Sequence, residues 1–225
     1  MNPNTIDAAP TKDFFITMLV KDIPLLKVIP DLVDNCVDGA RRIRSDGNYT
    51  DLWVRIEASD GFFEIWDNCG GISVDLARRY AFRLGRPHDM PGVPHSIGQF
   101  GIGMKRALFK IGRRFAVESS TPNSYFFLDV DVEKWKDTPE WTFEFDLCRE
   151  GIQDPDGDTG THIMVASLHE TVADDFARAN FLTMLREELE SKHSGIMDRG
   201  ITITLNKIPL RVPIVLPFRK TQVVS

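Results

Sequence analysis

Asp31 and Asn35 place a carboxylate and an amide four residues apart. On a helix they would share one face with Asp38, while Val33 and Val37 would point to a core. An asparagine oxygen can bind Mg²⁺, which prefers few protein ligands together with phosphates and water. A carboxylate one turn away could orient or deprotonate a water that attacks a γ-phosphate. The alternative is the solvated face of an amphipathic helix.

Asp67 ends an apolar segment and is followed by Asn68, Cys69, Gly70 and Gly71. An acid at a strand end, next to glycines, stands where a ligand can approach the backbone. An ionised carboxylate accepts hydrogen bonds, so it suits an exocyclic amine such as that of adenine. A plain Asx-type turn is the alternative for this segment.

Gly98, Gly101 and Gly103 run into a predicted helix that begins near Met104. Glycines let backbone N–H groups approach a phosphate, and the helix N-terminus adds its positive end. Lys105 stands in the first turn, where the macrodipole disfavours a cation unless an anion binds. The spacing is neither that of a P-loop nor that of a dinucleotide fingerprint. A glycine hinge without a ligand is the alternative.

Thr161 follows Gly160 at the start of a predicted strand. Its hydroxyl can donate and accept, so it can hold a water or an acid near a base. In chain order, the four segments indicate a nucleotide site.

Predicted helices and strands alternate along the chain and must position these residues. Apolar spacing predicts helices, and alternation with turn signals predicts strands. The predicted helices are 22–44, 73–82, 103–111 and 174–192. The predicted strands are 52–58, 62–66, 114–119, 124–132, 140–145, 161–166 and, last, 201–205. This order indicates an α/β two-layer sandwich, with helices on one face of a mostly antiparallel sheet.

Composition sets limits on the class of protein. The chain has 225 residues, a net charge of −6 and three cysteines. The negative charge does not support nucleic-acid binding, although local basic clusters remain. The cysteines are too few for a disulfide framework, and the N-terminus has no signal pattern. No apolar run reaches membrane-spanning length. We therefore expect a cytoplasmic protein without a membrane anchor.

Taken in order, the motifs resemble the GHKL ATPases, a superfamily that includes gyrase, the ninety-kilodalton heat-shock chaperones, histidine kinases and MutL. The resemblance covers roughly residues 15–210. The run IGQFGIGMK at 97–105 is most similar to the chaperone and MORC branches. The resemblance implies the Bergerat ATP-binding fold, and it divides the chain into an N-terminal arm (1–14), an ATP-binding domain (15–210) and a tail (211–225). The tail reads either as a final strand and arm or as the start of a further domain.

The resemblance also implies roles for single residues. Asp31 occupies the catalytic position, Asn35 binds Mg²⁺, and Asp67 reads the adenine amine with support from Thr161, while Gly71 lies near the base. The residues expected to wrap the phosphates are Gly98, Gln99, Phe100, Gly101, Ile102, Gly103 and Lys105. Residues 83–97 become a lid, which in this superfamily closes over ATP and typically drives dimerisation.

Two positions depart from the superfamily pattern. Asp31 stands where the family has Glu, and its shorter side chain places the carboxylate farther from a water positioned for Glu. A misplacement of about 1 Å can cost roughly 100-fold in rate. Pro30 predicts that the helix either starts or kinks there. Cys69 replaces the first glycine of the second motif, which would strain a positive φ unless Gly70 makes the turn.

The expected function is Mg²⁺-dependent ATP binding with slow hydrolysis to ADP and phosphate. Lid closure and ATP-dependent homodimerisation would act as a conformational switch on a client protein or output domain. The alternative is a nucleotide-sensing or scaffold module that does not hydrolyse ATP, which the exchange of Glu for Asp motivates.

Overall fold

The computed structural model describes residues 6, 8–83, 103–153 and 157–212. In this part of the chain, eight strands form one sheet in the order β5-β4-β3-β6-β2-β1-β7-β8. The strands are β1 (Trp53–Ala58), β2 (Phe63–Asp67), β3 (Gly112–Thr121), β4 (Ser124–Asp131), β5 (Leu147–Glu150), β6 (Gly160–Leu168), β7 (Thr202–Leu205) and β8 (Ile208–Pro209). Strands β1 and β7 pair in parallel, and the other neighbours are antiparallel. The mixed, mostly antiparallel sheet confirms the predicted fold class.

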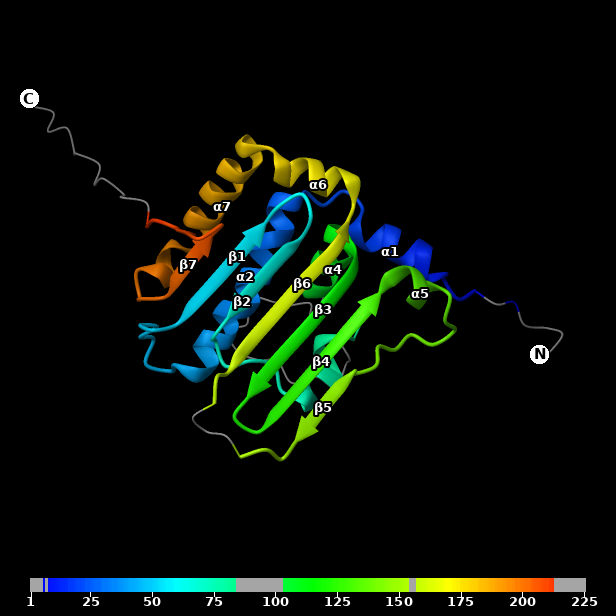
Figure 1. Ribbon diagram of the computed structural model, residues 1–225, viewed down its shortest axis with the longest axis horizontal. Coiled ribbons are helices and arrows are strands. Elements are labelled where there is room, and N and C mark those ends of the chain that lie inside the picture. Colours follow the sequence, from blue (N-terminus) through cyan, green and yellow to red (C-terminus); the bar gives the residue numbers. More distant parts are fainter. Residues whose placement is uncertain (1–5, 7, 84–102, 154–156, 213–225) are drawn as a thin grey trace, which may run out of the picture.

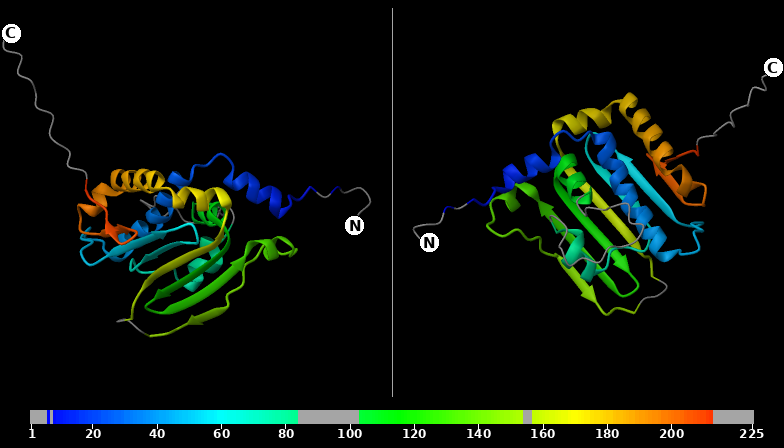
Figure 2. Two further views of the ribbon diagram at one scale, coloured as in Figure 1. Left: turned by 45° about the horizontal axis from the view of Figure 1, so that its top comes forward. Right: turned by 180° about the vertical axis from the view of Figure 1, so that it is seen from behind.

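The helices lie against one face of this sheet. They are α1 (Lys12–Val20), α2 (Leu25–Ile43), α3 (Val74–Leu76), α4 (Gly103–Ile111), α5 (Val132–Lys136), α6 (Glu170–Ala177) and α7 (Ala179–Met197), with one π-helical turn, η1 (Ala77–Ala81). Figure 1 shows the strands in front of α2 and α4, and the view from behind in Figure 2 shows these two helices lying over the sheet. The predicted two-layer sandwich is therefore observed.

The core lies between α2 and α4 on one side and the sheet on the other. In β1, Val54 and Ile56 are buried while Arg55 between them is exposed, which is the alternation that places one strand face on a core. Helix α2 buries Ile29 and Val33 against the same layer. The apolar periodicities that predicted these elements are thus the periodicities that build the core.

Pro30 lies inside α2 and not at its start. The helix begins at Leu25, with Pro24 in the N-cap position. The expectation that the helix could start at Pro30 is therefore wrong. Asp31 lies beyond the first turn, so the positive end of the helix dipole, which falls off within that turn, does not act on it.

The predicted helix at 174–192 is two helices. Helix α6 ends at Ala177, Arg178 is extended with φ −91° and ψ 117°, and α7 begins at Ala179. The break lets Phe176 at the end of α6 and Phe181 at the start of α7 both reach the core, with ring centroids 5.9 Å apart. Apolar spacing does not reveal the break at Arg178, because the segments on both sides of it are helical.

The predicted strand at 140–145 is wrong. The segment is irregular, and the edge strand β5 follows it at Leu147–Glu150. Phe143 contacts Phe115 and Trp135, at centroid separations of 5.8 and 5.1 Å, so aromatic packing fixes the segment in place of strand pairing. Strand β7 is likewise not the last, since β8 pairs with it.

Helix α1 begins inside the segment predicted as an N-terminal arm. Thr11 caps it by accepting a hydrogen bond from the Phe14 backbone N–H. The Lys12 side chain is buried and donates to the carbonyl oxygens of Trp135 and Thr138, each at 2.6 Å. Residues from Thr11 onward thus belong to the packed fold. Among the described helices, none has the length and apolar character needed to span a membrane.

Candidate functional site

A pocket lies between α2 and the ends of β2 and β6. Its lining residues are Leu32, Asn35, Cys36, Gly39, Arg42, Ile65, Asp67, Cys69, Gly71, Ile72, Met104, Thr161 and Ile163. The empty space between these residues, part of it open to solvent, is about 390 Å³. Four residues singled out in the sequence, Asn35, Asp67, Gly71 and Thr161, meet here although they are spread over more than a hundred residues.

Asp67 is the buried acid of this pocket, with 5% of its surface exposed. It is the last residue of β2, and its Oδ1 accepts a hydrogen bond from the Cys69 backbone N–H at 2.7 Å. Burial raises the pKa of the Asp67 carboxyl, and hydrogen bonds from the Cys69 and Thr161 backbones and the Cys36 thiol offset part of that rise. A buried carboxylate with few protein donors can accept a hydrogen bond from a ligand.

Two thiols flank Asp67. Burial and the Asp67 charge raise the pKa of Cys36 and of Cys69. The Cys36 thiol also donates to the Leu32 carbonyl oxygen at 3.4 Å. Both cysteines are therefore neutral, apolar wall residues and not reactive thiolates.

Thr161 belongs to a network of hydroxyl groups that the sequence did not reveal. Thr161 pairs directly with Asp67 across β6 and β2. Its Oγ1 lies 3.1 Å from the Oγ of Ser119, which is 1% exposed. Ser119 Oγ also lies 3.0 Å from the Gly160 carbonyl oxygen and accepts from the Ile72 N–H at 2.7 Å. Ser119 thus joins the turn after Asp67 to the strand that carries Thr161. The sequence places Ser119 in a predicted strand, but no pattern in the sequence indicates that its hydroxyl contacts Thr161.

The turn after β2 uses Gly70 and Gly71, with φ of +90° and +68°. Cys69 is not among the residues with positive φ. Gly70 makes the turn in its place, so the Cys69 side chain causes no backbone strain. A Cβ on Gly71 would overlap the Ser120 carbonyl oxygen. The second glycine of the motif is therefore required both by its φ and by the approach of β3.

Helix α2 reaches this turn at Gly39. A Cβ on Gly39 would lie 2.5 Å from the Cys69 carbonyl oxygen, so glycine allows the helix to approach. Three residues on, the Arg42 guanidinium donates to the Gly71 carbonyl oxygen at 3.3 Å. Arg42 brings the only positive side chain among the pocket residues of the described chain.

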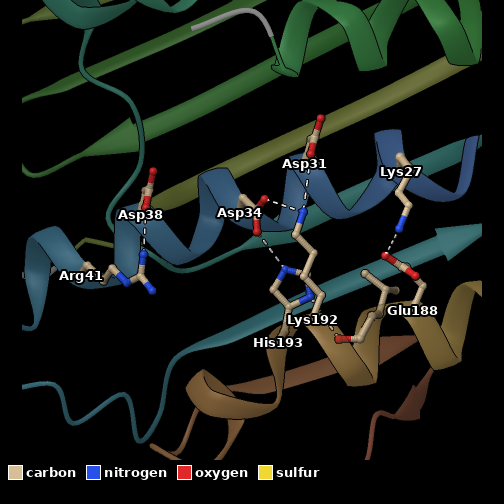
Figure 3. Close-up of polar contacts among 9 residues, drawn as sticks. Lys27, Asp31, Asp34, Asp38, Arg41, Glu188, Lys192 and His193 are labelled. Atoms are coloured by element: carbon tan, nitrogen blue, oxygen red, sulfur yellow. Dashed lines mark hydrogen bonds and ion pairs between the residues drawn. The ribbon is translucent and has the colours of Figure 1, made fainter. Parts of the chain in front are cut away.

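Asn35 and Asp31 follow along the same helix, away from Gly39. Asn35 is exposed in the pocket, and its amide has no hydrogen-bond partner among the described residues. The Asp31 side chain lies beside the start of α4, where its Oδ2 is 3.8 Å from the position a Cβ on Gly103 would take. Figure 3 shows Asp31 and Asp38 on the same side of α2, as the spacing predicted. Asp38 pairs with Arg41 at 3.3 Å.

Lys105 does not line this pocket. It is 1% exposed, and its ammonium group donates to the Ala81 carbonyl oxygen at 2.9 Å. Burial lowers the pKa of the Lys105 ammonium to about 8. Its predicted phosphate contact stays a prediction. Gly98, Gln99, Phe100, Gly101, Ile102 and the predicted lid from residue 84 onward lie outside the described residues.

The donor set fits a cation held mainly by its ligand. In the described part of the chain, no group of three or more His, Cys, Asp or Glu side chains could hold a metal. Mg²⁺ in nucleotide sites is bound through few protein oxygens together with phosphates and water. The exposed Asn35 amide oxygen, which has no hydrogen-bond partner in the part of the chain that the structure describes, is suited to such a single contact.

Comparison with protein-family models matches residues 23–149 to the family described as histidine kinase-, DNA gyrase B- and HSP90-like ATPase. The match spans 127 of the 225 residues and includes Asp31, Asn35, Asp67 and Gly71. Thr161 lies beyond it. A search of curated proteins found no match.

Proposed function

Because the chain belongs to the histidine kinase-, DNA gyrase B- and HSP90-like ATPase family, we propose that the pocket beside Asp67 binds the adenine of ATP and that the bound nucleotide is hydrolysed slowly. The observation that carries this proposal is the meeting of Asn35, Asp67, Gly71 and Thr161 in one pocket. Asp67, Gly71 and Thr161 suit the base, and Asn35 suits the metal ion that accompanies the phosphates.

The base would lie against Asp67. Its carboxylate accepts a hydrogen bond from the exocyclic amine, and the Thr161 hydroxyl, fixed by Ser119, supplies a second polar group. The apolar walls, including Leu32 and Ile163, contact the flat faces of the ring. This combination of an apolar pocket with few polar groups is typical of a site that binds one orientation of a ligand.

The phosphates would lie along α2 toward α4. Gly39 and Asp31 are eight residues apart on the helix, which is about 12 Å at the α-helical rise. Asn35, between them, would contact Mg²⁺, and the cation would neutralise phosphate charge. The N-terminus of α4 at Gly103 adds the positive end of its dipole.

Asp31 would act as the general base. A water attacks the γ-phosphorus while its proton moves to the Asp31 carboxylate, and the bond from the γ-phosphorus to the β–γ bridging oxygen breaks. ADP and phosphate result. Residues 83–97 would form the lid, and ATP would drive homodimerisation as a switch on a client protein or output domain. These last steps rest on the family resemblance.

Isothermal titration of the chain with a non-hydrolysable ATP analogue tests the binding step. We expect binding that requires Mg²⁺ in the titration buffer. An absence of binding at millimolar analogue contradicts the proposal.

A second candidate is a nucleotide sensor without hydrolysis. The feature that favours it is the side chain of Asp31, which is one methylene shorter than the glutamate of the ATPases that the chain resembles. Phosphate release measured beside sedimentation, with ATP and with its analogue, separates the two candidates. Equal dimerisation with both nucleotides and no phosphate release favours the sensor.

A further inference from the structure

Lys192 on α7 contacts two acids on α2. Its Nζ lies 2.7 Å from Asp34 Oδ2 and 3.5 Å from Asp31 Oδ1 (Figure 3). Asp34 is buried, and its other oxygen, Oδ1, lies 3.1 Å from His193 Nε2.

The two oxygens of Asp31 face different groups. Oδ1 faces the Lys192 ammonium group, whereas Oδ2 is the oxygen nearest Gly103, at the N-terminus of α4. An aspartate carboxylate that is about one-third exposed would otherwise rotate freely about its side-chain torsions. Holding one oxygen aims the other toward the end of the site where the phosphates would lie.

We propose that Lys192 is a positioning residue that orients the Asp31 carboxylate for attack by water on the γ-phosphate. The proposal rests on the proposed function, because it assigns a role within that site. It also accounts for how an aspartate can serve where the related ATPases use the longer glutamate.

Lys192 is itself held in place by Asp34 and His193. His193 is 3% exposed, and its Nδ1 lies 3.1 Å from the Leu189 carbonyl oxygen. Both ring nitrogens therefore have partners, which fixes the ring that faces Asp34. Burial opposes the Asp34 charge, but hydrogen bonds from His193 and Lys192 outweigh it and lower the pKa of the carboxyl. A charged Asp34 anchors the ammonium group beside Asp31.

The chain supplies a matched control in the same two helices. Lys27 of α2 pairs with Glu188 of α7 at 2.7 Å, one turn from Asp31 (Figure 3). Lys27→Met removes an ion pair between α2 and α7 without touching Asp31. Lys192→Met removes the contact with Asp31 while keeping the aliphatic part of the side chain.

The experiment measures kcat and KM for Mg²⁺-ATP, with analogue affinity by titration, in wild type, Lys192→Met, Lys192→Arg and Lys27→Met. We expect Lys192→Met to lower kcat by about 10- to 100-fold, the size of effect expected from a carboxylate misplaced by about 1 Å. Analogue affinity should stay within about twofold, since Lys192 is not among the residues that line the pocket. Lys192→Arg should recover part of the rate, and Lys27→Met should match wild type.

A double-mutant cycle with Asp31 completes the test. If Lys192 acts through Asp31, then Lys192→Met should cause no further loss of kcat in an Asp31→Ala background. Thermal unfolding of each variant shows whether it is folded. If Lys192→Met is not folded, Lys192→Arg takes its place in the cycle.

Three outcomes overturn the inference: a wild-type kcat in Lys192→Met, an equal loss in Lys27→Met, or a further loss when Asp31 is already absent. A wild-type chain that binds the analogue but releases no phosphate also overturns it and leaves nucleotide binding standing. A chain that binds no analogue instead overturns the proposed function itself.

Discussion

Asp67 and Thr161 face each other as direct partners on β2 and β6, although 94 positions separate them in the sequence. Gly160, just before Thr161, lies so close to the Asp67 backbone that a Cβ there would overlap the Asp67 carbonyl oxygen. Glycine at this point lets the two strands bring a carboxylate and a hydroxyl group to the same pocket wall.

Asp67→Asn should abolish binding of the ATP analogue without unfolding the chain. The amide keeps the size of the carboxyl group but presents an N–H group to the base amine, so two donors would meet. Because burial raises the pKa of Asp67, the ionised group costs stability at neutral pH, and the amide removes that cost. Titration calorimetry should show no binding, while the melting temperature without nucleotide should equal or exceed that of wild type.

Bound analogue should raise the melting temperature of wild type and not that of Asp67→Asn. A variant that binds with wild-type affinity would contradict the role assigned to Asp67. A variant that is unfolded would require the same test in Asp67→Ser, which also removes the charge.

Ser119→Ala should weaken both the fold and nucleotide binding. It leaves the Ile72 N–H without its buried acceptor and frees the Thr161 hydroxyl to rotate. We expect a loss of about 1–3 kcal/mol in unfolding free energy, from the unsatisfied buried donor. Analogue affinity should fall by roughly 10-fold, equivalent to one lost hydrogen bond at about 1.4 kcal/mol. Urea denaturation and calorimetry measure the two effects.

Ser191→Ala, at an exposed position on α7, is the control and should change neither quantity. Wild-type affinity in Ser119→Ala would show that Thr161 needs no second hydroxyl to hold it.

Gly71→Ala and Gly195→Ala should have opposite effects on stability. Gly71 has φ +68°, and a Cβ there would overlap the Ser120 carbonyl oxygen. Gly195 lies within α7, and a Cβ there would meet nothing within 4 Å. Gly195→Ala should therefore stabilise by up to about 1 kcal/mol through helix propensity. Gly71→Ala should destabilise by more than about 2 kcal/mol and abolish analogue binding. Equal melting temperatures for the two variants would contradict the geometry of the turn.

Two parts of the candidate site could be found from the sequence because their signals are short-range. Asp67 and Gly71 lie in one five-residue motif, and Asp31 and Asn35 are one helical turn apart. Residues that reach the site through strand order could not be predicted this way. Ser119 meets Thr161 because β3 is the neighbour of β6, and a single sequence gives no strand order.

The same limit explains the missed elements. Lys192 reaches Asp31 only because α7 packs beside α2, which no local pattern indicates. The aromatic residues near 141–145 have the composition of a strand, yet the rings around Trp135 provide the better contacts. Periodicity found most of the elements, but tertiary packing decided which of two local conformations each ambiguous segment took.

Lys105→Met should change how stability depends on pH. Burial lowers the pKa of Lys105 to about 8 in the folded chain, against 10.5 for an ordinary lysine. Between these values the unfolded chain binds more protons, so wild-type stability should rise with pH from about 8 to 10.5. The rise should amount to about 3 kcal/mol, from roughly 1.4 kcal/mol for each pKa unit. Methionine has no proton to lose, so this component should vanish.

Urea denaturation at pH 7 and pH 10 checks this, with Lys27→Met, an exposed lysine, as the control. If Lys105→Met keeps the wild-type rise between the two pH values, the buried ammonium group is not its source.

Asp34→Asn should destabilise the chain near neutral pH and much less in acid. The substitution leaves the Lys192 and His193 donors without their charged acceptor, so we expect a loss of about 3 kcal/mol at pH 6. Hydrogen bonds from His193 and Lys192 hold the pKa of Asp34 below 3.8 in the folded chain. The stabilisation it provides is therefore complete above the unfolded pKa and is lost as the pH falls through the lower, folded pKa.

The difference between wild type and Asp34→Asn should shrink as the pH falls below about 3.8. Urea denaturation of both proteins at pH 6 and pH 3 measures it, with exposed Asp60→Asn as the control. A difference that is as large at pH 3 as at pH 6 would mean that shape and not charge makes Asp34 necessary.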